Sequence, residues 1–155
     1  MASRTNDEEF VSVVREIFSE KIPFIKVLGL KVESISYERV RVSFQMRDEL
    51  MGNYKRGMLH GGVISSVIDA VGGLAALMGA QEKMRGKTLA TRLEKLERGS
   101  TIDLRVDFLR PGMGKWFVAT AYALKTGNKI VVTRIELNND QDDLVAIGTC
   151  SYFVA

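Results

Sequence analysis

The sequence is poor in cysteine and histidine, with one of each among 155 residues. The single Cys150 cannot form a disulfide within the chain, and one histidine excludes a multi-histidine metal site. We therefore expect no metal and no cofactor. The 22 basic residues exceed the 19 acidic ones only slightly and are scattered, which argues against a nucleic-acid partner. The N-terminus lacks the apolar core of a signal peptide, so we expect a cytoplasmic protein.

Long apolar runs are also absent, except for residues 61–80, which are long enough to span a bilayer. Asp69 lies near the middle of this run, where a carboxylate costs about 2.5–3.5 kcal/mol on an insertion scale. The many small residues also suit close packing inside a protein. We therefore favour a buried helix over a membrane span, and we expect no membrane partner.

The length suits one domain over residues 1–155, with 46% apolar residues to form its core. Apolar residues at helical spacing predict a helix over 1–22, which Pro23 ends. Alternating residues between Leu30 and Met46 predict two strands, and a loop is expected over 47–58.

The second half of the chain begins with a charged segment, residues 81–98. Its leucines at helical spacing predict a short surface helix that Gly99 ends, although this helix could instead cover a pocket. Four strands are expected after it, over 102–108, 116–124, 130–137 and 144–153. Antiparallel strands around one long helix predict an α+β fold. Because a helix that is apolar on all sides must be surrounded, a curved sheet closed by a second subunit would meet that need.

Asp69 is the only charged side chain in the long apolar segment. A carboxylate in such a setting needs a hydrogen bond or an ion pair. It could face a solvated interface or bind a loop, or it could act as a general base or nucleophile.

His60-Gly61-Gly62 precedes Asp69 and opens the same predicted helix. Two glycines leave backbone N–H groups uncovered at a helix N-terminus, where partial positive charge can stabilise an oxyanion. They could equally provide loop flexibility. Gly61 and Asp69 are eight positions apart, which is about 12 Å along a helix. They cannot both reach one carbonyl within a chain, so a shared reaction implies a dimer.

Leu59-His60-Gly61-Gly62, with Asp69 nine residues after the histidine, resembles the PaaI-like branch of the hotdog-fold thioesterases. The resemblance covers most of the chain. Residues 51–53, 99–106, 108–112 and 127–129 more specifically resemble the YigI-type medium- and long-chain acyl-CoA thioesterases. The resemblance implies an antiparallel sheet wrapped around a central helix, and hydrolysis of acyl-CoA to a fatty acid and CoA.

The resemblance also implies roles for individual residues. Asp69 corresponds to the catalytic carboxylate that activates or orients water, and Gly61 to the oxyanion donor. His60 is expected to hold its loop by hydrogen bonds. Asn53 corresponds to an asparagine that contacts the thioester, although it lies seven rather than six residues before the histidine. Thr101 corresponds to a hydroxyl that positions water, yet strand alternation places it on the polar face, away from the core. A bulge or the neighbouring subunit must resolve this conflict.

CoA is expected to contact Gly62 and three basic residues at strand ends and turns, namely Arg110, Lys125 and Lys129. A solvated surface charge is an equal alternative for each basic residue. A non-catalytic acyl-ligand sensor or regulator remains the competing function, but no DNA-binding segment is evident. Dehydratases of this fold generally use a histidine in a different local context. We favour a thioesterase that forms a homodimer and then a homotetramer.

Overall fold

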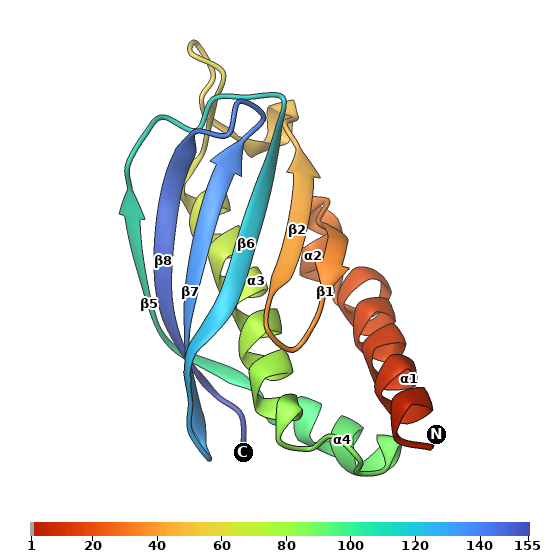
Figure 1. Cartoon of the computed structure of the whole chain (residues 1–155). Coiled ribbons are helices and arrows are strands. Elements are labelled where there is room, and N and C mark those ends of the chain that lie inside the picture. Colours follow the sequence, from red (N-terminus) through yellow and green to blue (C-terminus); the bar gives the residue numbers. More distant parts are fainter. Residues whose placement is uncertain (1) are drawn as a thin grey trace.

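A computed structural model describes residues 2–155 of the chain. One long helix lies against an antiparallel sheet, and shorter helices flank it (Figure 1). The helices are α1 (Ala2–Glu16), η1 (Ile17–Lys21), α2 (Pro23–Leu28), η2 (Asp48–Leu50), α3 (Gly61–Glu82) and α4 (Leu89–Leu96). The strands are β1 (Lys31–Ile35), β2 (Val40–Gln45), β3 (Met51–Asn53), β4 (Met58–Leu59), β5 (Ser100–Phe108), β6 (Trp116–Thr126), β7 (Ile130–Asn139) and β8 (Leu144–Phe153).

Six strands form one antiparallel sheet in the order β1-β2-β6-β7-β8-β5. Alternation along the strands directs one set of side chains to the core. In β2, for example, Val40, Val42 and Phe44 are buried while Arg41 and Gln45 are exposed. This architecture confirms the predicted α+β hotdog fold.

Helix α3 packs against the sheet and supplies much of the core. It approaches β8 closely because Gly148 faces Ile68, and a side chain at Gly148 would collide with that isoleucine. Helix α3 is long and apolar enough to cross a membrane, but 56% of its most apolar window is buried inside the protein. A core helix of a soluble protein has the same properties, which agrees with the predicted buried helix.

The N-terminal segment differs from the prediction at Pro23, which begins α2 instead of ending the helical structure. Proline suits the first position of a helix because its missing N–H would have no intrahelical partner there. A π-helical turn, η1, separates α1 from α2. Helix α1 buries Phe10 and Val14 as its spacing predicts.

Two segments differ in part from the prediction. The predicted loop over 47–58 contains a two-stranded hairpin of β3 and β4, which protrudes at the top of Figure 1. The predicted surface helix within 81–98 is present as α4, but its Arg92 is completely buried. Most of segment 81–98 is exposed, as predicted, and Arg92 is an exception because α4 packs against α1 and the end of α3.

Strand β5 forms an open edge of the sheet. Alternation predicted that its apolar residues face the core, but Ile102, Leu104 and Phe108 are 51%, 37% and 54% exposed. Only Val106 among the four apolar residues packs against the core cluster. The alternation along the strand was predicted correctly, but the burial of its apolar side chains was not, because no element within residues 2–155 covers that edge.

Candidate active site

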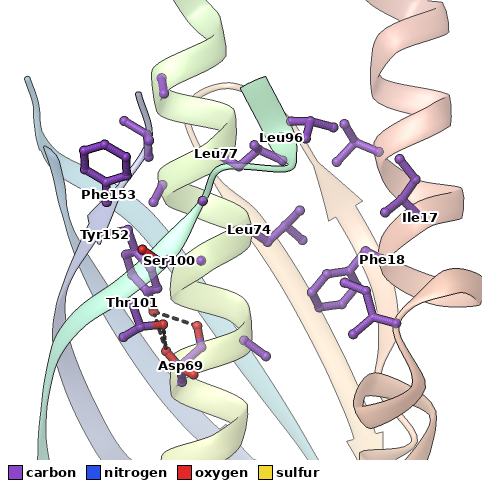
Figure 2. Close-up of a pocket in the computed structure, with 18 of the residues that line it drawn as sticks. Ile17, Phe18, Asp69, Leu74, Leu77, Leu96, Ser100, Thr101, Tyr152 and Phe153 are labelled. Atoms are coloured by element: carbon purple, nitrogen blue, oxygen red, sulfur yellow. Dashed lines mark hydrogen bonds between the residues drawn. The ribbon is translucent and has the colours of Figure 1, made fainter. Parts of the chain in front are cut away.

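The side chain of Asp69 lies beside residues from two strands that are distant in sequence (Figure 2). The Thr101 hydroxyl donates a hydrogen bond of 2.9 Å to Asp69 Oδ1. The Tyr152 hydroxyl donates at 2.6 Å to the backbone oxygen of Asp69 and lies 3.3 Å from Oδ1. Among the described residues, no donor is recorded for the other carboxylate oxygen, Oδ2. The half-buried carboxylate is thus oriented on one side and free to accept a proton on the other.

A β-bulge turns Thr101 toward Asp69. The pairing of β5 with β8 shifts between Thr101 and Asp103, so Ile102 is an extra residue in β5. Thr101 pairs with Tyr152, whose side chain faces the helix. Simple alternation therefore fails at Thr101, and the bulge, one of the two alternatives that the sequence left open, resolves the conflict, because a one-residue insertion reverses the face that each side chain occupies.

Tyr152 belongs to the site although the sequence did not point to it. Its hydroxyl approaches α3 because Gly72 carries no side chain; a Cβ there would lie 2.6 Å from that oxygen. Burial raises the pKa of Tyr152 strongly, and neighbouring Cys150 and Asp69 raise it further. Tyr152 therefore remains a hydrogen-bond donor to Asp69.

His60 caps α3. Its Nδ1 accepts a hydrogen bond of 2.8 Å from the backbone N–H of Gly62. This hydrogen bond holds the loop at the start of the helix, which is the role expected for His60. The Gly62 N–H is therefore already bonded to His60. The Gly61 N–H, at the positive end of the helix, has no acceptor among the described residues.

An apolar cavity of about 390 Å³ begins at Asp69 and follows one face of α3. Its volume lies within the range of small-molecule sites. Figure 2 shows the space between α3 and α1, with Asp69, Thr101 and Tyr152 at one end and Leu77 and Leu96 toward the other. Most of the remaining lining is aliphatic or aromatic, with Gln81, Lys95 and Ser100 as the polar residues, so the cavity suits a hydrocarbon chain.

The other predicted residues do not gather around Asp69 within one chain. Asn53 lies in the β3–β4 hairpin, where its side-chain oxygen accepts from the Arg56 backbone N–H at 3.3 Å. Arg110 follows β5 and donates to the backbone oxygen of Leu144. Lys125 and Lys129 lie near the β6–β7 turn, across the sheet from the start of β5 and about 23 Å along β8 from Arg110. These roles remain predictions.

Cys150 is buried between β5 and β7 in the sheet. Burial raises the pKa of its thiol to about 11, so it is not a nucleophile at neutral pH. No group of three possible metal ligands occurs within residues 2–155. Asp69 is therefore the side chain through which the described site could activate water.

Comparison with known proteins gives consistent results. A family model described as the thioesterase superfamily matches residues 56–146. The medium/long-chain acyl-CoA thioesterase YigI of Escherichia coli (strain K12) is 35% identical over 154 residues, covering 99% of both chains. A solved structure from Shewanella oneidensis, described as related to the thioesterase superfamily, has a TM-score of 0.92 and 38% identity, covering 96% of this chain and 97% of that one. A candidate thioesterase from Syntrophus aciditrophicus SB is 56% identical, with a TM-score of 0.87 over 97% of this chain and 99% of that one.

Proposed function

Because the chain belongs to the thioesterase superfamily and is a thioester hydrolase, we propose that it hydrolyses medium- and long-chain acyl-CoA in the cytoplasm. The observation that carries this proposal is the position of Asp69, an oriented carboxylate at the end of an apolar cavity. The cavity would hold the acyl chain, and the carboxylate would lie beside the thioester. The relative YigI is named for the same substrates.

In the proposed reaction, Asp69 accepts a proton from water as the water oxygen attacks the thioester carbonyl. The hydrogen bond from Thr101 fixes the carboxylate for this step. The negative charge that develops on the carbonyl oxygen is stabilised by the free amide of Gly61 at a helix N-terminus. Collapse of the intermediate breaks the carbon–sulfur bond, and the proton held by Asp69 passes to the leaving thiolate.

The two catalytic elements would come from different chains. Thr101, near the start of β5, binds Asp69. Gly61 instead lies beside Phe108 at the end of β5, and a Cβ placed on Gly61 would lie 3.5 Å from the phenyl ring. An exposed edge strand favours pairing with a copy of itself. Antiparallel pairing of two β5 strands would put the end of one beside the start of the other. Gly61 of the partner subunit would then approach Asp69.

The same pairing offers an explanation for the scattered basic residues. Arg110 follows the end of β5, and Lys125 and Lys129 lie near its start across the sheet. In an antiparallel dimer, Arg110 of the partner subunit would approach Lys125 and Lys129, where the CoA phosphates could bind. The homodimer could assemble further into the homotetramer that we propose.

Hydrolysis of a panel of acyl-CoAs of increasing chain length tests the proposal. We expect turnover to release fatty acid and CoA, with the highest kcat/KM for medium or long chains. Acyl-pantetheine substrates that lack the nucleotide should show a higher KM, and charge reversal of Lys125 or Lys129 should affect only the substrates with a nucleotide. Tight binding of acyl-CoA without hydrolysis would instead support the non-catalytic acyl-ligand sensor.

A further inference from the structure

The apolar cavity follows small residues on one face of α3. It extends from Asp69 to Gln81, a rise of about 18 Å for twelve helical residues. Ala70, Gly73 and Ala80 lie on the same face and carry little or no side chain. Their small size leaves room between α3 and α1 for an extended chain. What limits the length of that chain must lie at the end remote from Asp69.

That remote end is formed by α4 and the residues next to it. Leu96, a half-buried residue of α4, lines the cavity there together with Ala80 and Gln81. Leu93 lies on the same helix and is also half-buried against the core, but it does not line the cavity. Two half-buried leucines in the second half of α4 thus face different surroundings. Leu96 faces the cavity, and Leu93 faces the protein interior.

Helix α4 is held in place by a buried arginine. The Arg92 side chain is completely buried and donates to Gln81 Oε1 at 3.1 Å, to Asp7 Oδ1 at 2.8 Å and to the Tyr37 hydroxyl at 2.7 Å. Its guanidinium also stacks 3.7 Å from the centre of the Phe10 ring. Arg92 thus joins α4 to α1, to the end of α3 and to the β1–β2 turn. Because a buried charge must keep its partners, these contacts hold the end of the cavity in one position.

We infer that α4, positioned by Arg92, sets the longest acyl chain that this protein hydrolyses efficiently, with Leu96 as the contacting residue. This inference rests on the proposed acyl-CoA thioesterase function. A chain that exceeds the cavity must displace Leu96, and Leu96 cannot yield without moving a helix that Arg92 fixes to three other elements. Segment 81–98 would then determine the preference for acyl chain length.

The test compares matched variants of the full chain on saturated acyl-CoAs of increasing length. Leu96→Ala should extend the efficient range by about two or three methylenes, the space that it vacates, at about fourfold in kcat/KM for each buried methylene. Ala80→Leu fills the same region and should lower kcat/KM for the longest chains by about 10- to 100-fold. Chains too short to reach Ala80 should be unaffected in both variants. Leu93→Ala is the control, since it removes the same atoms from the same helix outside the cavity.

The wild-type chain tests the proposed function, and the variants test the role of α4 in chain-length preference. If the wild type hydrolyses no acyl-CoA, the proposed function is wrong, and the inference with it. If the wild type is active but Leu96→Ala has the wild-type chain-length profile, or the profile of Leu93→Ala, the inference is wrong and the proposed function stands.

The positioning role of Arg92 has its own readout. Asp7→Asn keeps a hydrogen-bond acceptor but removes the charge that faces Arg92, so the chain can still fold. If Arg92 positions α4, this variant should lose discrimination against overlong chains, with kcat for short chains unchanged. A purely structural role would lower stability and leave the ratio of long-chain to short-chain kcat/KM at the wild-type value, which would overturn the assignment.

Discussion

The hydroxyl of Thr101 lies 2.9 Å from the carboxylate of Asp69, although 32 positions separate the two residues in the chain. The contact exists because Ile102 forms a bulge in β5 and turns the preceding threonine toward α3. Tyr152, opposite Thr101 in the sheet, binds the same aspartate. Two strands thus orient the carboxylate that the helix carries.

Replacing Asp69 with asparagine should remove the base while leaving the fold intact. Asparagine keeps an oxygen that can accept from Thr101 and Tyr152, so the local geometry can persist. The loss of a positioned general base lowers turnover by about 10²–10⁴-fold. Steady-state kcat on an acyl-CoA substrate measures the effect, with Asp48→Asn, at an exposed carboxylate on η2, as the control. Wild-type kcat in a folded Asp69→Asn protein would remove Asp69 from the mechanism.

Replacing Thr101 with valine should reduce turnover while leaving Asp69 in place. A hydrogen bond to a charged group contributes about 1.5–3 kcal/mol. If that contribution orients the carboxylate in the transition state, Thr101→Val lowers kcat by about 10- to 100-fold. Thr101→Ser retains the hydroxyl and should recover most of the activity. Equal activity of the valine and serine variants would show that the hydroxyl does not contribute.

The shared-site proposal predicts complementation between two inactive variants. Asp69→Asn and Gly61→Val damage the two halves of the site that we assign to different chains. A mixed dimer should then contain one site with both defects and one site with neither. Activity should therefore return to about half of that of a wild-type dimer. The two folded variants are unfolded and refolded together, and the heterodimer is isolated by a tag on each. A verified heterodimer that remains inactive contradicts the shared site.

The ion pair of Asp7 with Arg92 should make stability depend on acidic pH. Burial by itself raises the pKa of Asp7, but hydrogen bonds from Arg85, Arg92 and Tyr37 hold it below the ordinary 3.8. A carboxyl whose pKa is lower in the folded than in the unfolded chain stabilises the fold at higher pH. This contribution is fully present above the unfolded pKa and is lost as pH falls through the folded pKa.

We therefore expect the free energy of unfolding of the wild type to decrease as the pH falls below 3.8. Asp7→Asn should be less stable than the wild type at neutral pH and should show a shallower decrease in acid. Urea unfolding at a series of pH values measures both, and Asp48→Asn, at an exposed carboxylate on η2, serves as the control. A variant that keeps the wild-type acid dependence would contradict this role of Asp7.

Much of this fold could be predicted from local sequence because each element carries its own period. The spacing of apolar residues shows which face of a helix or strand meets the core. Residues close together in the sequence are enough to reveal that spacing. The long helix, its start at His60 and the strands of the main sheet followed from these patterns. The candidate carboxylate, Asp69, followed as well, because a lone charge in an apolar helix is costly unless it is paired or hydrogen-bonded.

The tertiary structure alone decided which residues meet that carboxylate and where the cavity ends. Alternation alone places Thr101 on the wrong face and could not decide between a bulge and a neighbouring subunit, because a bulge adds a single residue whose position depends on the neighbouring strand. Tyr152 and Arg92 gave no local signal, since their partners lie 83 and 85 positions away. Local periodicity specifies the face of each element, but such contacts arise only when the packed elements bring distant positions together. Local patterns thus predict the fold and the proposed reactive group, and packing determines how that group is oriented and what space lies beside it.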